Sequence, residues 1–163
     1  MNAHVDIQNA SSEPVPEEPD LCRWISAALA HSHAGNEAQL CLRLVDEDEM
    51  AALNSTYRAK TGPTNVLSFP ADLPPELGLP LLGDIVICAP VVAREASAQG
   101  KPLAAHWAHM AVHGCLHLLG YDHIEDHDAA VMEALETTIL AQLGLPCPYT
   151  DHSHHPDKEL VAQ

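Results

Sequence analysis

Short apolar runs separated by turn residues predict four strands in this chain. Leu40, Leu42 and Leu44 alternate with other residues, which is typical of a strand that is buried more on one face. The run 85–88 is continuously apolar and rich in β-branched residues, which favours a strand buried on both faces. The complete set of expected strands is 5–10, 40–45, 66–69 and 85–88.

Between these runs the apolar positions recur with helical spacing. The first helix is expected from residue 21 with Asp20 as its cap, and the second begins after Asp46, which stands three residues before Glu49 as in a capping box. Three further helices are expected over 90–99, 102–119 and 126–143, with Gly100 and Gly144 as stops. Because strands and helices interleave, we expect a mixed α/β (α+β) fold: a small, mostly parallel four-stranded sheet packed with about five helices.

Composition limits the class of protein. A chain of 163 residues with 47% hydrophobic residues is long and apolar enough for one packed domain, which we expect to span residues 1–150, followed by a polar, His-rich, disordered tail over 151–163. No run approaches the ~18 apolar residues of a membrane span, the N-terminus lacks a signal-peptide pattern, and the five cysteines are spaced unlike a zinc knuckle or a disulfide framework. We therefore expect a cytoplasmic protein with free thiols. The net charge of −16 argues against a protein that coats nucleic acid through bulk charge.

The histidines carry the strongest chemical signal. His113 and His117 are four residues apart in a predicted helix, so their imidazoles lie on the same face, one turn apart. Gly120 can adopt positive φ and end the helix, which lets the chain turn back and present His123 as a third ligand. Three histidines would leave a tetrahedral zinc ion with one open position, which is the catalytic pattern. Such a site also suits nickel, copper or iron.

Other polar residues near this motif have less certain roles. His109 is also four residues before His113. Three ligands along one straight helix span about 12 Å and cannot converge on one ion. We therefore expect His109 to contact the ligands without binding the metal, or to lie in the core. His106 and His127 are expected to be partly exposed. Asp122 or Asp126 could accept an N–H from a ligand histidine, although Asp126 could equally be a helix cap.

The spacing of the three histidines matches the metzincin protease pattern H-E-x-x-H-x-x-G-x-x-H, with one difference. Gly114 stands where those proteases carry the glutamate that acts as general base. A zinc peptidase therefore remains an alternative that lacks its usual base. Cleavage of a phosphodiester depends more on neutralising charge, so an arginine directed at the metal would favour a nuclease.

Three ordered motifs resemble the YbeY family of bacterial endoribonucleases. They are the segment 113–123, which follows H-G-x-L-H-L-x-G-Y-D-H, the segment 53–70 and the segment 82–88. The resemblance covers most of 40–144. Thr61 and Asn65 stand where the family often has aspartate.

The resemblance implies a zinc-dependent, single-strand-specific endoribonuclease of ribosomal RNA maturation, acting at the 3′ end of 16S rRNA, and of ribosome quality control. It implies His113, His117 and His123 as ligands of one zinc ion on a metzincin-like helix, and Arg58 as the arginine that stabilises the phosphate. Arg58 could instead be a surface residue interacting with a helix C-terminus. The implied partners are single-stranded RNA and the small ribosomal subunit or its proteins. A non-enzymatic ribosome assembly factor remains a second alternative.

Overall fold

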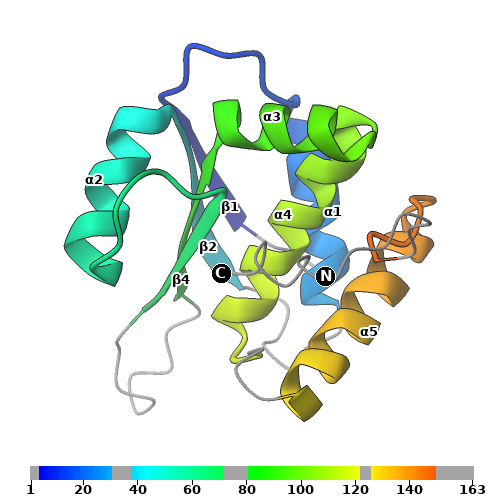
Figure 1. The fold of residues 1–163 in the computed structure, drawn as a ribbon. Coiled ribbons are helices and arrows are strands. Elements are labelled where there is room, and N and C mark those ends of the chain that lie inside the picture. The colour runs from blue at the N-terminus through cyan, green and yellow to red at the C-terminus, as the bar shows by residue number, and fades with distance from the viewer. Residues whose placement is uncertain (1–3, 31–37, 72–80, 122–125, 150–163) are drawn as a thin grey trace.

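A four-stranded sheet organises the chain. The computed structural model describes residues 4–30, 38–71, 81–121 and 126–149. The strands are β1 (His4–Asn9), β2 (Gln39–Val45), β3 (Val66–Pro70) and β4 (Leu81–Cys88), in the order β1-β2-β4-β3. β1, β2 and β4 are parallel, and the edge strand β3 runs antiparallel to β4 (Figure 1).

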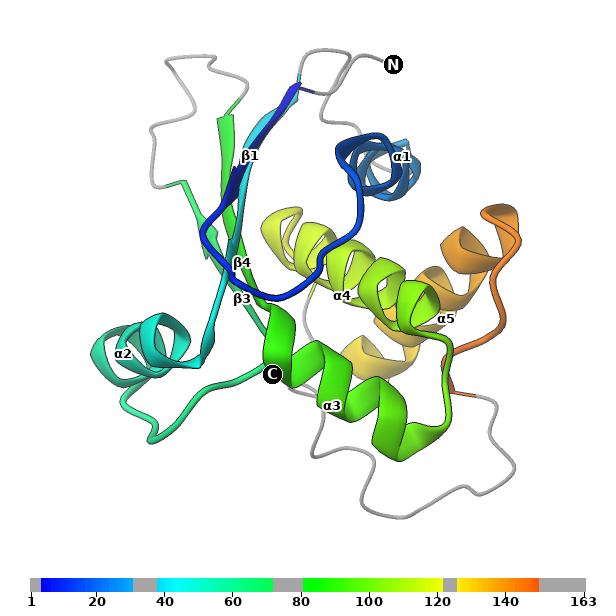
Figure 2. The ribbon, with the colours of Figure 1, turned by 90° about the horizontal axis from the view of Figure 1, so that it is seen from above.

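Helices cover the two faces of the sheet unequally. The five described helices are α1 (Glu18–Leu29), α2 (Glu47–Arg58), α3 (Ala89–Gln99), α4 (Leu103–Leu118) and α5 (Asp126–Gln142). Figure 2 shows α1, α4 and α5 on one side of the sheet and α2 on the other, with α3 at the end of the sheet where β4 finishes. The arrangement confirms the predicted mixed α/β fold with a mostly parallel sheet.

α4 is the central helix of the core. It lies between the sheet and α5, with α1 beside it (Figure 2). Twelve of its 16 residues are buried, because apolar neighbours surround it on three sides. Any polar side chain on this helix is therefore removed from water and needs a partner. This requirement governs the histidines described below.

Helix starts differ in detail from the sequence prediction. α1 begins at Glu18 with Glu17 as the N-cap, so Asp20 lies inside the first turn and does not cap the helix; Pro19 is accommodated in that turn because its missing N–H is not needed there. Asp46 is the N-cap residue of α2 as predicted, but its carboxylate makes no capping bond. It accepts hydrogen bonds from the hydroxyls of Ser11 at 2.5 Å and Ser12 at 2.8 Å, which ties the segment after β1 to α2.

The predicted tail 151–163 lies outside the described residues, so its disorder stays a prediction. Among the described helices, none is both long and apolar enough to cross a bilayer.

Candidate metal centre

His113 and His117 meet as their spacing in the sequence predicts. Both lie on the last two turns of α4, and their Nε2 atoms are 3.2 Å apart. Two nitrogens that bind one tetrahedral zinc ion at 2.0–2.1 Å are separated by about 3.3 Å. The two imidazoles are therefore already placed to share a metal ion.

Gly120 ends α4 in the way that a returning ligand requires. Its φ is +104°, and two bonds close the helix end: Gly120 N–H donates to His117 O at 3.0 Å and Tyr121 N–H donates to Leu116 O at 3.0 Å. These are the two hydrogen bonds of a Schellman motif with glycine in the left-handed position. The chain therefore turns immediately after the histidine pair. His123 lies outside the described residues, so its role as third ligand stays a prediction.

A buried carboxylate on α5 forms a hydrogen bond with the ring nitrogen of His113 that does not face His117. Glu136 is 0% exposed, and its Oε2 lies 2.6 Å from Nδ1 of His113. A carboxylate accepts hydrogen bonds, so the proton of His113 is on Nδ1 and the lone pair of Nε2 faces His117. Metal-binding histidines are commonly oriented by a carboxylate in this way, which fixes the tautomer and raises the basicity of the ligand.

Glu136 has two further donors. Nε2 of His109 donates to its Oε1 at 3.0 Å, and the hydroxyl of Tyr149 donates to the same oxygen. The Tyr149 hydroxyl also lies 3.2 Å from Nε2 of His109. The carboxylate thus receives hydrogen-bond donors from α4 and from the segment after α5, and these donors stabilise its fully buried charge.

Burial and hydrogen bonds act in opposite directions on the pKa values of this cluster. Burial by itself raises the pKa of Glu136, but the hydrogen bonds and charges of His109 and His113 outweigh it and hold that pKa well below its usual range. Burial lowers the pKa of His109 against the opposing effect of Glu136. Burial, followed by the Glu136 charge, raises the pKa of Tyr149. The cluster therefore combines an ionised carboxylate with a neutral phenol.

The same cluster offers a second way to hold a metal. One ligand atom from each of His109, His113 and Glu136 lies within 4.8 Å of the others, so these three buried residues could hold an ion. Within this group, the His113 nitrogen in contact with Glu136 is Nδ1, and the 2.6 Å contact has the length of a charge-assisted hydrogen bond. The predicted arrangement uses Nε2 of the same ring. The two nitrogens of His113 thus face two different sets of partners.

The packing of α4 explains why residue 114 has no side chain. A Cβ atom on Gly114 would lie 2.8 Å from Cγ2 of Ile85 and 3.3 Å from Cγ2 of Val66. The Gly114 carbonyl accepts a hydrogen bond from the Ser68 hydroxyl at 2.9 Å, so the helix backbone touches β3 directly. A glutamate at this position would require the Ile85 side chain or the helix to shift. The packing of α4 on the sheet therefore disfavours the general base of the metzincin pattern.

Arg58 and the histidine pair belong to helices on opposite faces of the sheet. Arg58 is the last residue of α2, and its side chain is exposed and makes no hydrogen bond or ion pair within the described part of the chain. α2 packs on the sheet face opposite α4 (Figure 2), so the edge strand β3 lies between the two helices. Ala59 follows with φ +55°, a left-handed conformation that ends the helix directly after Arg58. No described contact joins Arg58 to the histidines, and its role stays a prediction.

Two residues of the Glu136 cluster were not predicted from the sequence, and the exposure of a neighbouring histidine was predicted wrongly. Glu136 occupies the same helix face as the buried Met132 and Leu140, and an acidic residue within such an apolar stripe is a signal for a buried partner. Tyr149 gave no comparable signal. His106 was expected to be partly exposed and is 1% exposed, because the first turns of α4 are covered by α3 and by the segment after α5.

The two aspartates that were predicted as possible partners of a ligand histidine have no described side chains. Asp122 lies outside the described residues, and the Asp126 side chain is not described. The carboxylate that His113 uses comes from Glu136 instead.

Comparison with known proteins identifies the family of this chain. The family described as Endoribonuclease YbeY matches residues 6–144. Relatives named endoribonuclease YbeY include one from Stutzerimonas stutzeri, 57% identical over 91% of this chain and 92% of the relative, and one from Pseudomonas syringae pv. tomato, 54% identical over 95% and 97%. A solution structure of a Thermotoga maritima protein shares the fold, with a TM-score of 0.53 and 22% identity over 91% of this chain and 99% of that one. The chain belongs to the endoribonuclease YbeY family.

Proposed function

We propose that this chain is a zinc-dependent, single-strand-specific endoribonuclease of the cytoplasm that matures ribosomal RNA, at the 3′ end of 16S rRNA, and takes part in ribosome quality control. The observation that carries the proposal is the 3.2 Å separation of the His113 and His117 Nε2 atoms in a member of an endoribonuclease family. The donor set of neutral imidazoles suits zinc, and His123 would complete it.

The protein's own residues prepare this site for a cation. Glu136 holds the proton of His113 on Nδ1, so Nε2 offers its lone pair to the metal without a change of tautomer. Gly120 ends α4 in a turn, which would allow His123 to return toward the histidine pair. A bound zinc ion supplies positive charge that polarises a phosphate oxygen and promotes the ionisation of water near neutral pH.

Arg58 is proposed to bind the scissile phosphate. A guanidinium offers a planar pair of donors to phosphate oxygens and stabilises the charge that builds on them during cleavage. Its exposure and its position before the loop that leads into β3 support this role. Because α2 and α4 lie on opposite faces of the sheet, the RNA strand would pass around the edge strand β3 to contact both.

The net negative charge implies that a partner brings the RNA to the protein. With 7 lysines and arginines against 23 acidic residues, affinity for naked RNA should be weak and salt-sensitive. We therefore propose that the small ribosomal subunit or one of its proteins brings the substrate to the enzyme. Cleavage of naked RNA by the wild type should therefore be slower than cleavage of the same RNA in small subunits.

The test is RNA cleavage by the wild type, His113→Ala, Arg58→Glu and Arg23→Glu, with and without a chelator. Arg23 is exposed on α1 and forms an ion pair with Asp20, so Arg23→Glu makes the same charge change away from the site. Expected results are loss of cleavage for His113→Ala and for chelated wild type, a rate reduced by about 10²-fold or more for Arg58→Glu, and little change for Arg23→Glu. Equal losses for both arginine variants would contradict the role of Arg58.

Two outcomes would overturn the proposed reaction. Cleavage of unfolded casein but not of single-stranded RNA by the metal-loaded protein would identify a peptidase. Full support of ribosome maturation by a folded, metal-free His117→Ala variant would identify an assembly factor. The attacking group is either water or the 2′-OH of the RNA itself, and product analysis distinguishes them, since a 2′,3′-cyclic phosphate excludes direct attack by water.

A further inference from the structure

The sheet face that carries α2 is only partly covered by this helix. Where α2 packs, its Met50 joins Leu67 and Val86 in a small second core (Figure 2). Beside that core an open pocket of about 420 Å³ remains, within the range of about 300–1,000 Å³ that is usual for ligand sites. Its wall comes from α2 and its floor from all four strands, and it shares no residue with the histidine cluster. We call it the α2 pocket.

The strand register places a carboxylate next to an aromatic ring on the floor of the α2 pocket. Asp84 of β4 pairs with Phe69 of β3 and with Cys41 of β2, so the three side chains form one row across the sheet. Directly opposed residues of antiparallel strands, such as Asp84 and Phe69, have Cβ atoms about 4.5–5.5 Å apart. Asp84 is exposed, and it forms no hydrogen bond or ion pair within the described part of the chain. Its carboxylate is therefore an accessible acceptor.

Tyr57 of α2 continues this aromatic surface. Its ring contacts Phe69 edge to face, with ring centroids 5.2 Å apart and an angle of 68° between the ring planes. Tyr57 is nevertheless 64% exposed. Because Phe69 contacts Tyr57 and lies opposite Asp84, the α2 pocket combines a surface for stacking with a hydrogen-bond acceptor one side chain away.

The guanidinium of Arg43, which also lines the α2 pocket, is already paired. Its Nε and Nη2 donate to the Glu49 carboxylate at 2.6 Å and 3.0 Å, and its Nη1 donates to Oε1 of Gln8 at 3.1 Å. A phosphate group in this pocket would therefore find this cation engaged and would face the charge of Asp84. The group that fits is flat and carries hydrogen-bond donors.

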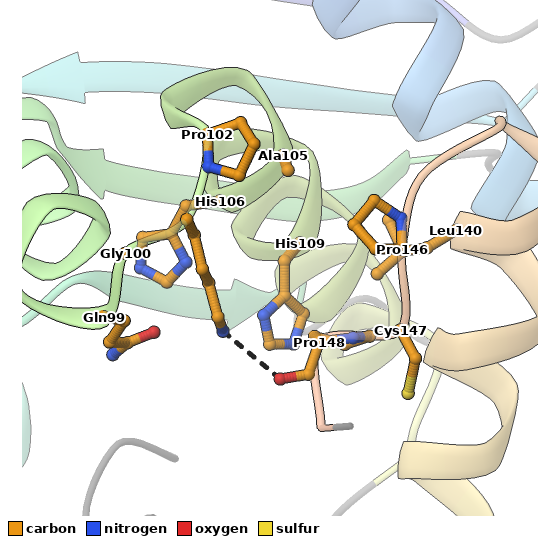
Figure 3. Close-up of a pocket in the computed structure, with 11 residues that line it drawn as sticks. Gln99, Gly100, Pro102, Ala105, His106, His109, Leu140, Pro146, Cys147 and Pro148 are labelled. Atoms are coloured by element: carbon orange, nitrogen blue, oxygen red, sulfur yellow. Dashed lines mark hydrogen bonds between the residues drawn. The ribbon is translucent and has the colours of Figure 1, made fainter. Parts of the chain in front are cut away.

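The hollow between the end of α3, the start of α4 and the segment after α5 offers less to a ligand (Figure 3). Its Lys101 ammonium donates to the Pro148 carbonyl at 3.2 Å. Within the described residues, Nδ1 of His106 and Nδ1 of His109 form no hydrogen bond, but both atoms are buried, so a molecule in the hollow cannot reach them. The accessible acceptor of the α2 pocket makes it the better candidate.

Guanine has the shape and the donors that the α2 pocket requires. Its N1–H and N2–H groups lie side by side on one edge of a flat ring, and a carboxylate can accept both, as it accepts the paired donors of a guanidinium. Adenine and cytosine carry a ring acceptor at the matching position, which the carboxylate would repel. Uracil offers a single N–H between two carbonyl oxygens.

An arginine side chain of a protein would also pair with Asp84. The base is favoured by the order of residues in α2, because Tyr57 directly precedes Arg58. A nucleotide stacked on Tyr57 would lie near the residue that is proposed to bind the phosphate. The binding of bases on exposed aromatic rings is also typical of proteins that act on single-stranded RNA.

We propose that the α2 pocket binds a guanine base of the RNA substrate, which stacks on Tyr57 and donates from N1 and N2 to the Asp84 carboxylate. This inference rests on the proposed function and names a base that the enzyme recognises beside the cleaved phosphate. A free guanine nucleotide presents the same donors, so the experiment includes both sources.

The test is calorimetric binding of three nucleoside 5′-monophosphates to the metal-free full chain. Guanosine monophosphate should bind about tenfold more tightly than inosine monophosphate, which lacks the N2 amino group, and adenosine monophosphate should bind most weakly. Tyr57→Ala should weaken the binding of guanosine monophosphate about tenfold, and Tyr57→Phe should preserve it because the ring remains.

Two aspartates of the same sheet face provide a matched pair of variants. Asp84→Asn should reduce the affinity for guanosine monophosphate to that for adenosine monophosphate. Asp6 of β1 is also exposed and pairs with Cys41, but it does not line the pocket, so Asp6→Asn makes the same charge change outside it. Asp6→Asn should leave the preference for guanine unchanged.

The inference is wrong if guanosine monophosphate does not bind at millimolar concentration, if adenosine monophosphate binds equally well, or if the two aspartate variants behave alike. Binding of an arginine-rich peptide that depends on Asp84, without binding of guanosine monophosphate, would assign the pocket to a protein partner instead.

Oligouridylate with and without one central guanosine distinguishes the two sources of the base. Tighter binding of the guanosine-containing strand, lost in Asp84→Asn, supports an RNA base. A preference seen with the free nucleotide alone overturns the role in substrate binding and assigns the pocket to a nucleotide ligand. Since no cleavage is measured, failure here leaves the endoribonuclease proposal standing, and guanine binding by a protein that does not cleave RNA leaves the pocket standing.

Discussion

Glu136 accepts a hydrogen bond from Nδ1 of His113 at 2.6 Å, across the interface between α5 and α4. This bond couples the metal centre to the core, because the same carboxylate is 0% exposed and also receives donors from His109 and Tyr149. The position of His113 thus depends on the docking of α5 as well as on its own helix. In the proposed three-histidine site, a residue outside the ligand set would therefore control how His113 faces the metal.

Replacing Glu136 by glutamine should weaken metal binding by about 10–100-fold, the usual effect of losing a carboxylate behind a ligand histidine. The amide is nearly isosteric but neutral, and it no longer fixes the proton on Nδ1 of His113. Competition with a chelator of known affinity measures the loss, and the ¹⁵N shifts of His113 in the metal-free protein report its tautomer. Glu133→Gln, at an exposed position of the same helix, is the control. Equal affinities for the two variants would contradict this role.

Acid should destabilise the metal-free protein partly through Glu136. Burial alone would raise its pKa. The hydrogen bonds from His109 and His113 outweigh burial and hold this pKa well below the ordinary value of 4.5 in the folded chain. A carboxylate with a depressed pKa contributes stability above the unfolded value, and this contribution is lost as the pH falls below about 4.5.

Urea unfolding at a series of pH values measures this contribution. The difference in free energy of unfolding between the wild type and Glu136→Gln should shrink as the pH is lowered from 6 toward 3. The difference between the wild type and Glu133→Gln serves as the reference. A Glu136→Gln difference that stays constant over this range would show that the ionised carboxylate adds no stability.

The sequence predicts local features of this site well and long-range features poorly. The spacing of His113 and His117 and the turn at Gly120 follow from helix geometry and from the conformational freedom of glycine, so both were predictable from a few neighbouring residues. Glu136 meets His113 only because α5 packs on α4, a contact between residues 23 positions apart in the chain. The edges of the sheet and the order of its strands are likewise decided by tertiary packing, which local patterns do not encode.

Gly114→Ala should destabilise the protein, although alanine normally stabilises a helix relative to glycine by about 1 kcal/mol. The added Cβ would lie 2.8 Å from Cγ2 of Ile85, a buried β-branched side chain that cannot rotate away. Overpacking of this kind costs about 1–3 kcal/mol. Chemical denaturation of the metal-free variant measures the change.

A double-mutant cycle with Ile85→Ala identifies the cause of that loss. If the two side chains clash, truncating Ile85 should cost less in the Gly114→Ala background than in the wild type. Additive effects would place the strain elsewhere in the helix. A variant as stable as the wild type would show that α4 can move away from the sheet, and the packing argument against a metzincin-like glutamate would then fail.

Comparing Gly120→Ala with Gly144→Ala should show whether the turn at the end of α4 affects zinc affinity in addition to protein stability. Both glycines follow a helix in the left-handed conformation, with φ +104° and +81°, and both complete the same pair of Schellman hydrogen bonds. An alanine Cβ meets no atom within 4 Å at either position, so backbone strain of about 1–2 kcal/mol is the main cost in each case. Both variants should lose similar stability in the metal-free state, but only Gly120→Ala should also lower the zinc affinity in chelator competition, because its turn leads toward His123. Equal zinc affinities for the two variants would show that the turn after α4 does not position a ligand.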